Sequence, residues 1–239
     1  MLRPLNIVTH HKCASTWLQR YLAEFCELNA KEFFGSHYSR FAPPASAEVV
    51  ALTNASYDFV EGTLQDGVHI IRNPLDIVVS AYFSHRNTHA LDGWPKLSRQ
   101  REVLRSAPEA DGLFVTLSFL ERDDFYDGAV GPLHALRHWN YADARFQTMR
   151  MEDMVRNPGA ALGSILLSRF PESVLPVDDN YSFEAMSGRR IGKVDEASHY
   201  RSGKADQWRQ ALPPTIVKYI RTHYADILNA FYPEAADDD

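Results

Sequence analysis

The first thirty positions of the chain change from a strand pattern to a helix pattern. Leu5–Thr9 is a short apolar run, and the apolar residues between Ser15 and Phe25 recur at spacings of three and four. This spacing places side chains on one face of a helix. The pattern therefore predicts a strand over Leu5–Thr9, then a loop, then a helix that begins at Ser15.

The same change from strand to helix occurs once more before the middle of the chain. Gly67–Ile71 is an apolar run suited to a buried parallel strand. Asn73 is a good N-cap residue, Pro74 suits the first helical position, and Asp76 places an acidic side chain in the first turn. A second strand-to-helix junction is therefore predicted here.

Two segments are rich in turn-forming residues. Residues 41–57 contain Pro43-Pro44 and small polar residues, and we expect mostly loop there. Residues 87–112 are polar and broken by glycine and proline. They are predicted to form an insertion that could act as a lid, with one helix over Pro95–Ser106.

The remaining pattern completes a single α/β domain over residues 1–239. Three further helices are predicted over 112–122, 130–142 and 158–170, with a strand over Phe146–Met151. A final helix follows Pro214, stops at Pro233 and leaves a frayed tail at 234–239. Alternating strands and helices predict a parallel sheet flanked by helices on both faces. Its ligand site is expected at the carboxyl ends of the strands.

Composition narrows the classes of function. The 239 residues are 45% hydrophobic, as in an ordinary globular enzyme, and the net charge of −6 argues against a nucleic-acid or anionic membrane partner. Two cysteines are too few for a disulfide framework. We find no basic-then-apolar leader and no apolar run long enough to cross a membrane. These features predict a cytoplasmic protein.

The loop after the first strand carries groups that suit a phosphate. A strand-to-helix junction collects free backbone N–H groups at the positive end of a helix. Lys12 adds a charge, and Ser15 and Thr16 add hydroxyl donors. The loop is not a Walker A sequence, because it lacks glycine and its lysine precedes the hydroxyls. A plain helix N-cap beside a surface lysine is the alternative interpretation.

The second junction also suits an anion. Arg72 stands at the end of the predicted strand, and Ser80 lies about two turns into the next helix. A guanidinium can bind such an anion bidentately, and a hydroxyl can add a further donor. The alternative is an Arg72–Asp76 ion pair that only ties the turn.

Both segments resemble motifs of the sulfotransferase family. Lys-x-x-Ser-Thr-Trp at 12–17 resembles the family's loop around the 5′-phosphosulfate of 3′-phosphoadenosine 5′-phosphosulfate (PAPS). Arg-Asn-Pro-x-Asp-x-x-x-Ser at 72–80 resembles its 3′-phosphate element. Met151–Pro158, Ser182–Met186 and Tyr200–Trp208 resemble three further family segments in the right order. The chain is thus similar to small bacterial-type cytosolic sulfotransferases over most of residues 7–210.

Several motif positions depart from the family. The substitutions are His11 for the usual proline, Ala14 and Asp206 for glycine, Met151 for tyrosine, Ser202 for lysine and Gln207 for aspartate. The extra methyl group of Ala14 is expected to restrict how closely the backbone approaches the phosphate.

The resemblance implies a P-loop-like sulfotransferase fold and PAPS as the cofactor. The reaction implied is in-line transfer of a sulfuryl group to a hydroxyl or amine acceptor without a metal. Lys12 would stabilise the charge that grows on the oxygen between phosphorus and sulfur. The residues implied in binding PAPS are Lys12, Cys13, Ala14, Ser15, Thr16, Trp17, Arg72, Ser80, Phe183, Arg201, Ser202 and Gly203.

The general base has three candidates. The histidine that cytosolic relatives carry about twenty residues before the 3′-site arginine has no counterpart in the segment Tyr57–Gly62. Glu32 fits the spacing of the base in carbohydrate-acting relatives, and His37 and Glu61 are the next choices. Each could equally be an ordinary polar residue.

Other features complete the sequence-based hypotheses. Cys13, at a helix N-terminus beside Lys12, is expected to favour the thiolate and to be alkylated faster than Cys26. His85 and His89, four residues apart, are more typical of a structural pair than of a metal site. The acceptor is expected to be a small molecule or a carbohydrate, contacted by residues 33–41 and 82–94. A P-loop kinase and a nucleotide-binding module without catalysis are the rival interpretations.

Overall fold

The protein is built on a five-stranded parallel sheet with the strand order β2-β3-β1-β4-β5. The structure, a computed structural model, describes residues 3–37, 42–198 and 200–236. The strands are β1 (Leu5–Thr9), β2 (Phe33–Ser36), β3 (Val49–Thr53), β4 (Gly67–Ile71) and β5 (Phe146–Arg150). All four strand pairings are parallel. The predicted parallel α/β sheet is confirmed, and β1 and β4 have their predicted bounds.

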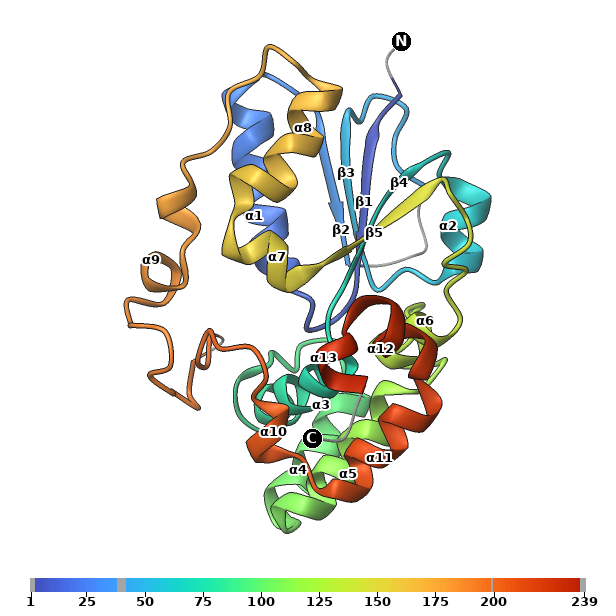
Figure 1. Cartoon of the computed structure of the whole chain (residues 1–239), viewed down its shortest axis with the longest axis vertical. Helices are drawn as coiled ribbons and strands as arrows, with labels where there is room; N and C mark the ends of the chain where they lie inside the picture. The colour runs from blue at the N-terminus through green and yellow to red at the C-terminus, as the bar shows by residue number, and fades with distance from the viewer. Residues whose placement is uncertain (1–2, 38–41, 199, 237–239) are drawn as a thin grey trace.

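Helices cover both faces of the sheet and also the carboxyl ends of its strands (Figure 1). One face carries α1 (Ser15–Leu28), α7 (Met151–Arg156), η2 (Gly159–Gly163) and α8 (Ser164–Arg169), and the other carries α2 (Tyr57–Thr63). The segment with η3 (Asp178–Tyr181) and α9 (Phe183–Ser187) runs down one side of the molecule.

The remaining helices gather below the strand ends, and we call them the helical base. They are α3 (Pro74–Phe83), η1 (Ser84–Thr88), α4 (Pro95–Ser106), α5 (Glu109–Leu120), α6 (Pro132–Arg137), α10 (Trp208–Ala211), α11 (Pro214–His223), α12 (Ala225–Phe231) and α13 (Pro233–Ala236). Because the ligand site of a parallel sheet lies at its carboxyl ends, the base and the sheet enclose that site between them.

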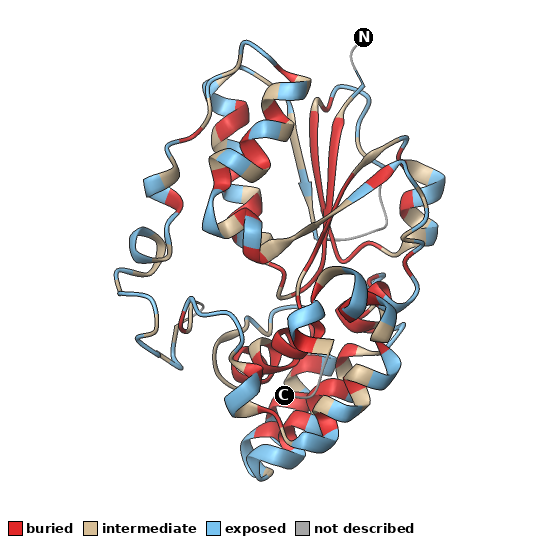
Figure 2. Ribbon diagram, in the orientation of Figure 1, coloured by how far each residue is buried: buried red, intermediate tan, exposed pale blue. Residues whose placement is uncertain are grey.

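Three hydrophobic cores hold these layers together (Figure 2). Successive strand residues point to opposite faces. Ile7 of β1 therefore packs in the core with α1, whereas Val8 packs in the core with α2. Burial on both faces explains why β1 and β4 read as continuous apolar runs. The third core fills the helical base and reaches up to Ile71 at the end of β4.

Strands β2 and β3 and several short helices, among them α2, were not predicted. Residues 41–57 contain β3 (Val49–Thr53), which pairs with β1 along its full length, and β2 adds an edge strand to β3. Ser56 accepts a hydrogen bond from the Phe59 N–H and so caps α2. The turn-forming residues around Pro43-Pro44 concealed the run Val49–Thr53, yet its pairing with β1 and β2 fixes the sheet.

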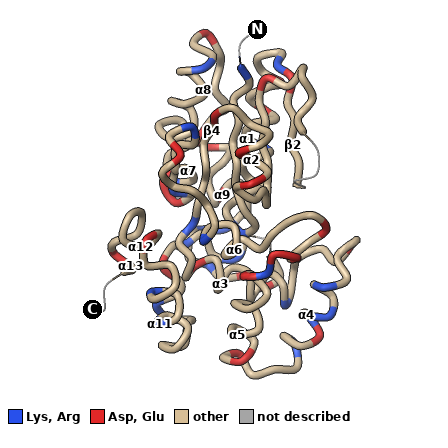
Figure 3. The backbone as a smooth tube through the Cα atoms, turned by 90° about the vertical axis from the view of Figure 1, so that its right-hand side faces the viewer, with Lys and Arg blue, Asp and Glu red and all other residues tan. Residues whose placement is uncertain are grey.

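The predicted insertion helix is present with its predicted bounds as α4. Leu97 and Leu104 lie in the core of the helical base, so α4 is packed against the rest of the base. The final helix is divided into α11 and α12 at Tyr224, and Pro233 begins the short helix α13. Acidic and basic segments are mixed over both the sheet and the base (Figure 3). Among the described residues, no helix is long and apolar enough to cross a membrane.

Candidate functional site

The loop between β1 and α1 (His10–Ala14) holds two residues in the left-handed conformation. Lys12 has φ 68° and Ala14 has φ 56°. The Cys13 N–H donates to the His10 carbonyl at 3.0 Å, and the Thr9 hydroxyl donates to the Cys13 carbonyl at 3.1 Å. Left-handed residues in such a turn direct successive N–H groups toward one point and form an anion-binding nest. The loop thus holds strained backbone where a phosphate would bind.

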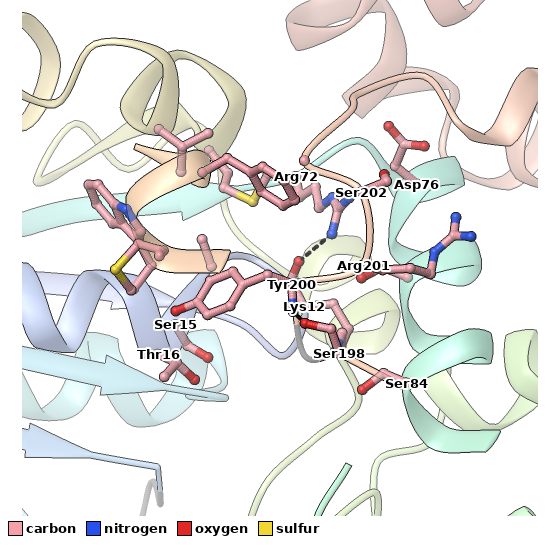
Figure 4. A pocket seen from close by; sticks show the side chains of 18 of the residues that line it. Lys12, Ser15, Thr16, Arg72, Asp76, Ser84, Ser198, Tyr200, Arg201 and Ser202 are labelled. Atoms are coloured by element: carbon pink, nitrogen blue, oxygen red, sulfur yellow. Dashed lines mark hydrogen bonds between the residues drawn. The ribbon is translucent and has the colours of Figure 1, made fainter. Parts of the chain in front are cut away.

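Lys12 lies at the centre of the site (Figure 4). Its ammonium has no acceptor among the described residues. Burial, and secondarily the charge of Arg72, lowers the pKa of Lys12 to about 7. An anion bound beside Lys12 would supply the missing counter-charge and restore its positive form. The lysine is therefore prepared for an anionic ligand.

Arg72 joins the two strand-to-helix junctions. Its Nη1 donates to the Lys12 carbonyl at 2.8 Å, and its Nε is buried without a partner among the described residues. The following residue, Asn73, caps α3 by accepting from the Leu75 N–H at 3.0 Å, as predicted. The Asn73 N–H in turn donates to the carboxylate of Glu152 at 3.3 Å. Arg72 is thus held by its neighbours with guanidinium N–H groups still to be satisfied.

Asp76 anchors another part of the site rather than forming a close ion pair with Arg72. Its carboxylate accepts hydrogen bonds from the backbone N–H groups of Asp206 at 2.8 Å and Trp208 at 3.1 Å. Burial raises the pKa of Asp76, while Arg72 opposes that rise. Asp76 therefore fixes the segment 200–208, which we call the Arg201 loop, over the start of α3.

The Arg201 loop brings a second guanidinium to the site. Arg201 lies over the ring of Phe83 at 3.9 Å and contacts the side-chain oxygen of Gln207. Gly203 has φ 65°, and a Cβ there would meet the Phe183 ring at 2.5 Å. Only glycine allows this approach, so the retained Gly203 is what places the aromatic ring of Phe183 against the loop.

The predicted PAPS-binding residues line one cavity of about 830 Å³, with a single exception. This volume is in the range of small-molecule sites. The lining includes Lys12, Ala14, Ser15, Thr16, Trp17, Arg72, Ser80, Phe183, Arg201, Ser202 and Gly203. Figure 4 shows side chains from the loop after β1, the start of α3 and the Arg201 loop around the same space.

The exception is Cys13, whose side chain does not line the cavity. Its side chain is fully buried in the core of the helical base. Burial raises the pKa of the Cys13 thiol to about 12, and the same cause raises that of Cys26 to about 12. Burial thus opposes the thiolate form of Cys13, contrary to what its place at a helix N-terminus suggested.

The three candidate bases lie in different places. Glu32 is exposed and comes just before β2, at the amino end of that strand, whereas the cavity lies at the carboxyl ends. Glu61 is exposed on α2, outside the cavity lining. His37 follows the carboxyl end of β2 and lines the cavity. Of the three, the structure brings only His37 to the site.

The cavity also contains residues outside the set implied in binding PAPS. They come from the β1–α1 loop, the end of β3, the end of η1 with the segment after it, and the stretch before α6: His11, Thr53, Asn54, Thr88, His89, Trp94 and Tyr126. The segment 82–94 was expected to contact the acceptor, and several of its residues do line this end. We call these residues the acceptor end of the cavity.

Two anion-binding junctions at neighbouring strands define a P-loop-like α/β fold. A family model described as a sulfotransferase domain matches residues 67–232, more than half of the chain. The chain belongs to this sulfotransferase family, and it is an enzyme of the transferase class.

Solved structures share this fold. The chain is similar to the mouse sulfotransferase SULT7A1 complexed with PAP, at 15% identity and a TM-score of 0.63, covering 98% of this chain and 90% of that chain. It is also similar to a retinol dehydratase in complex with androsterone and inactive cofactor PAP, at 13% identity and a TM-score of 0.54, covering 95% and 82%. The comparison with curated proteins finds no match.

Proposed function

We propose that this sulfotransferase moves a sulfuryl group from PAPS to a hydroxyl or amine of a small-molecule or carbohydrate acceptor. The observation that carries the proposal is the Arg72–Lys12 hydrogen bond, which joins two anion-binding junctions inside one cavity. PAPS has phosphate groups at both ends of its ribose and therefore needs two such sites. The two similar solved structures hold PAP, the product that PAPS leaves.

The 3′-phosphate would lie between Arg72, Ser80 and Arg201. All three side chains line the cavity, and they come from the end of β4, from α3 and from the Arg201 loop. Arginine suits this task because its planar fork matches phosphate oxygens bidentately. Ser80 would add a hydroxyl donor from the second turn of α3.

The 5′ end would lie in the nest of the β1–α1 loop. Ser15 and Thr16 supply hydroxyl groups at the first turn of α1, and the helix dipole adds partial positive charge. Lys12 would contact the oxygen between phosphorus and sulfur. As the S–O bond breaks, negative charge grows on that oxygen, and the ammonium stabilises it more in the transition state than in the ground state.

Adenine would be held by the segment that carries Phe183. The indole N–H of Trp17 donates to the Tyr181 carbonyl at 2.9 Å and so ties this segment to α1. The ring of Phe183 lines the cavity next to Gly203. An aromatic face here provides a stacking surface for a planar base.

The proposal includes no metal, and it places the enzyme in the cytoplasm. The sulfuryl group carries less charge than a phosphoryl group, so Lys12 and the loop N–H groups supply the charge that the transfer needs. We therefore expect unchanged rates in the presence of a chelator. In a reducing compartment the buried thiols of Cys13 and Cys26 stay unpaired, as they are in the structure.

Calorimetric titration with 3′,5′-adenosine bisphosphate, beside ADP and ATP, tests the proposal. The bisphosphate should bind selectively, because only it carries the 3′-phosphate. Arg72→Ala should weaken its binding by tens- to a hundred-fold, since a charged hydrogen bond contributes about 1.5–3 kcal/mol.

Arg99→Ala is the matched control, because Arg99 is exposed on α4 outside the cavity lining. Equal affinity for all three nucleotides, or equal effects of the two substitutions, would contradict the proposal.

A further inference from the structure

A buried hydrogen-bonded histidine pair lies behind the acceptor end of the cavity. His11 Nε2 and His85 Nε2 are 2.8 Å apart, and His85 Nδ1 is 2.9 Å from Oε1 of Gln100. His85 is fully buried and Gln100 nearly so, whereas His11 also lines the cavity directly beside Lys12. The three side chains thus form a line that runs from the protein interior to the site.

The proton positions follow from taking Oε1 of Gln100 as a hydrogen-bond acceptor. With Oε1 of Gln100 as the acceptor, His85 carries its proton on Nδ1 and its Nε2 holds a lone pair. That lone pair accepts from His11, which therefore carries its own proton on Nε2. The Nδ1 of His11 is then the basic nitrogen of its ring.

The backbone around His85 is built to hold this line. His85 lies in η1 (Ser84–Thr88), a π-helical turn at the end of α3, and such turns are frequent at functional sites. The guanidinium of Arg101 donates from Nε to the His85 carbonyl and from Nη2 to the His89 carbonyl. Trp94 and Phe125 pack on the ring of His11 with centroid distances of 5.7 and 5.3 Å.

We propose that His11 is the general base that takes the proton of the acceptor, with His85 and Gln100 as positioning residues. The inference rests on the proposed function. In the reaction the acceptor oxygen forms a bond to sulfur, while the S–O bond to the 5′-phosphate breaks and its electron pair stays on the phosphate oxygen. The acceptor proton moves to Nδ1 of His11, and the resulting imidazolium donates through Nε2 to His85.

Position distinguishes His11 from the other histidines of the cavity. It directly precedes Lys12, the group assigned to the leaving oxygen, so base and leaving-group lysine come from one loop. His37 is exposed beyond β2, and His89 packs its ring edge-on against His11 at 4.9 Å. His11, by contrast, is oriented by the buried side chains of His85 and Gln100.

Among the residues that the structure describes, the charged and titratable groups that act on His85 come from three elements. They are Lys12 on the β1–α1 loop, His89 after η1 and Arg101 on α4. Burial, followed by these positive or titratable neighbours, keeps the pKa of His85 well below its ordinary value. His85 therefore stays neutral and can accept the hydrogen bond from His11 throughout the working range.

The first test is His11→Gln with phenols of increasing acidity. General-base catalysis contributes about 10²–10⁴-fold, so kcat for phenol should fall by that factor. The loss should be much smaller for 4-nitrophenol, which is acidic enough to react with little help from a base. The affinity for 3′,5′-adenosine bisphosphate should change less than threefold.

His138→Gln is the matched control, since His138 is exposed on the surface after α6. Wild-type transfer together with undiminished kcat in His11→Gln would overturn this inference and leave the proposed function standing. Absence of transfer by the wild type to every hydroxyl acceptor tried would overturn both. An equal loss for phenol and 4-nitrophenol would assign His11 a structural role instead.

The second test changes Gln100, the residue that orients His85. Gln100→Leu removes the acceptor that orients His85, and we expect a tenfold or larger loss in kcat with unchanged nucleotide affinity. Gln100→Glu places a carboxylate at the end of the line, which favours the imidazolium. The acid limb of the pH profile of kcat should then move to higher pH. An unchanged pH profile in a folded Gln100→Glu variant would contradict the proposed link from Gln100 through His85 to His11.

Discussion

The two ends of the cavity are built differently. At the nucleotide end, a strained loop, two helix N-termini and Arg72 come from short continuous segments at strand ends. At the acceptor end, His11 comes from that same loop, but His89 and Tyr126 come from two other parts of the chain and reach it only through the packing of the helical base. The nucleotide end thus uses backbone geometry, which many sequences share. The acceptor end uses side chains, which each enzyme can change.

Lys12→Met is expected to have the largest effect, because Lys12 lies where the two ends meet. Loss of one positioned charge at a developing anion reduces turnover by about 10²–10³-fold. Nucleotide affinity should fall much less, since Arg72 and the loop N–H groups remain. Measuring kcat and the dissociation constant of the bisphosphate separately checks this, and an equal loss in both would contradict the assigned role.

The same substitution should stabilise the fold. The pKa of Lys12 in the folded protein is about 7, below its ordinary unfolded value near 10.4, so its charged form destabilises the native state most fully below pH 7. That penalty disappears as the pH rises past the unfolded pKa. We expect Lys12→Met to raise the free energy of unfolding by about 1–2 kcal/mol at neutral pH. Chemical denaturation at pH 7 and pH 10 measures this difference, which should shrink at pH 10.

The affinity of the nucleotide end for the bisphosphate should depend on pH. The ligand binds the protonated form of Lys12, whose pKa in the empty site is about 7. Below that pH the affinity should be constant as far as Lys12 is concerned, and above it the affinity should fall by up to about tenfold per pH unit. Lys12→Arg stays charged and serves as the control. In Lys12→Arg the affinity for the bisphosphate should no longer fall above pH 7. If it still falls, another group causes the pH dependence of binding.

Ala14→Gly is expected to have the smallest effect. Ala14 adopts φ 56° where the family has glycine, and a left-handed alanine costs about 1–2 kcal/mol. Replacing Ala14 with glycine removes this strain from the folded protein. The glycine also gives the unfolded chain more conformational entropy, which offsets part of the gain. We therefore expect a net increase of about 0.5–1 kcal/mol in the free energy of unfolding. Asp206→Gly, at φ 56° in the Arg201 loop, offers an independent second position. A loss of stability in both variants would contradict the assigned strain.

The nucleotide end could be predicted from the sequence because its chemistry is local. Strand, loop and helix follow each other within residues 5–28 and again within 67–83, so hydrophobic period and capping residues place Lys12 and Arg72 without tertiary information. The burial of Cys13 could not be predicted, because it depends on the helical base folding under the loop.

The acceptor end could not be predicted from the sequence, because the place of its residues depends on strands that the hydrophobic pattern does not reveal. β2 is a four-residue edge strand with a glycine, and without it the place of Glu32 at the amino end of a strand could not be seen. The place of His37, at the carboxyl end of the same strand, could not be predicted for the same reason. The link between His11 and His85 joins residues 74 positions apart, and no spacing rule connects them.

The most direct test of the account is transfer itself. Purified enzyme is incubated with PAPS and a panel of hydroxyl and amine acceptors, and formation of PAP is compared with and without acceptor, in the wild type and in Lys12→Met. The account predicts PAP formation that requires an acceptor, yields a sulfated product in equal amount and is lost in Lys12→Met. Binding of PAPS without acceptor-dependent PAP formation across the panel would contradict it and leave a nucleotide-binding module in place of an enzyme.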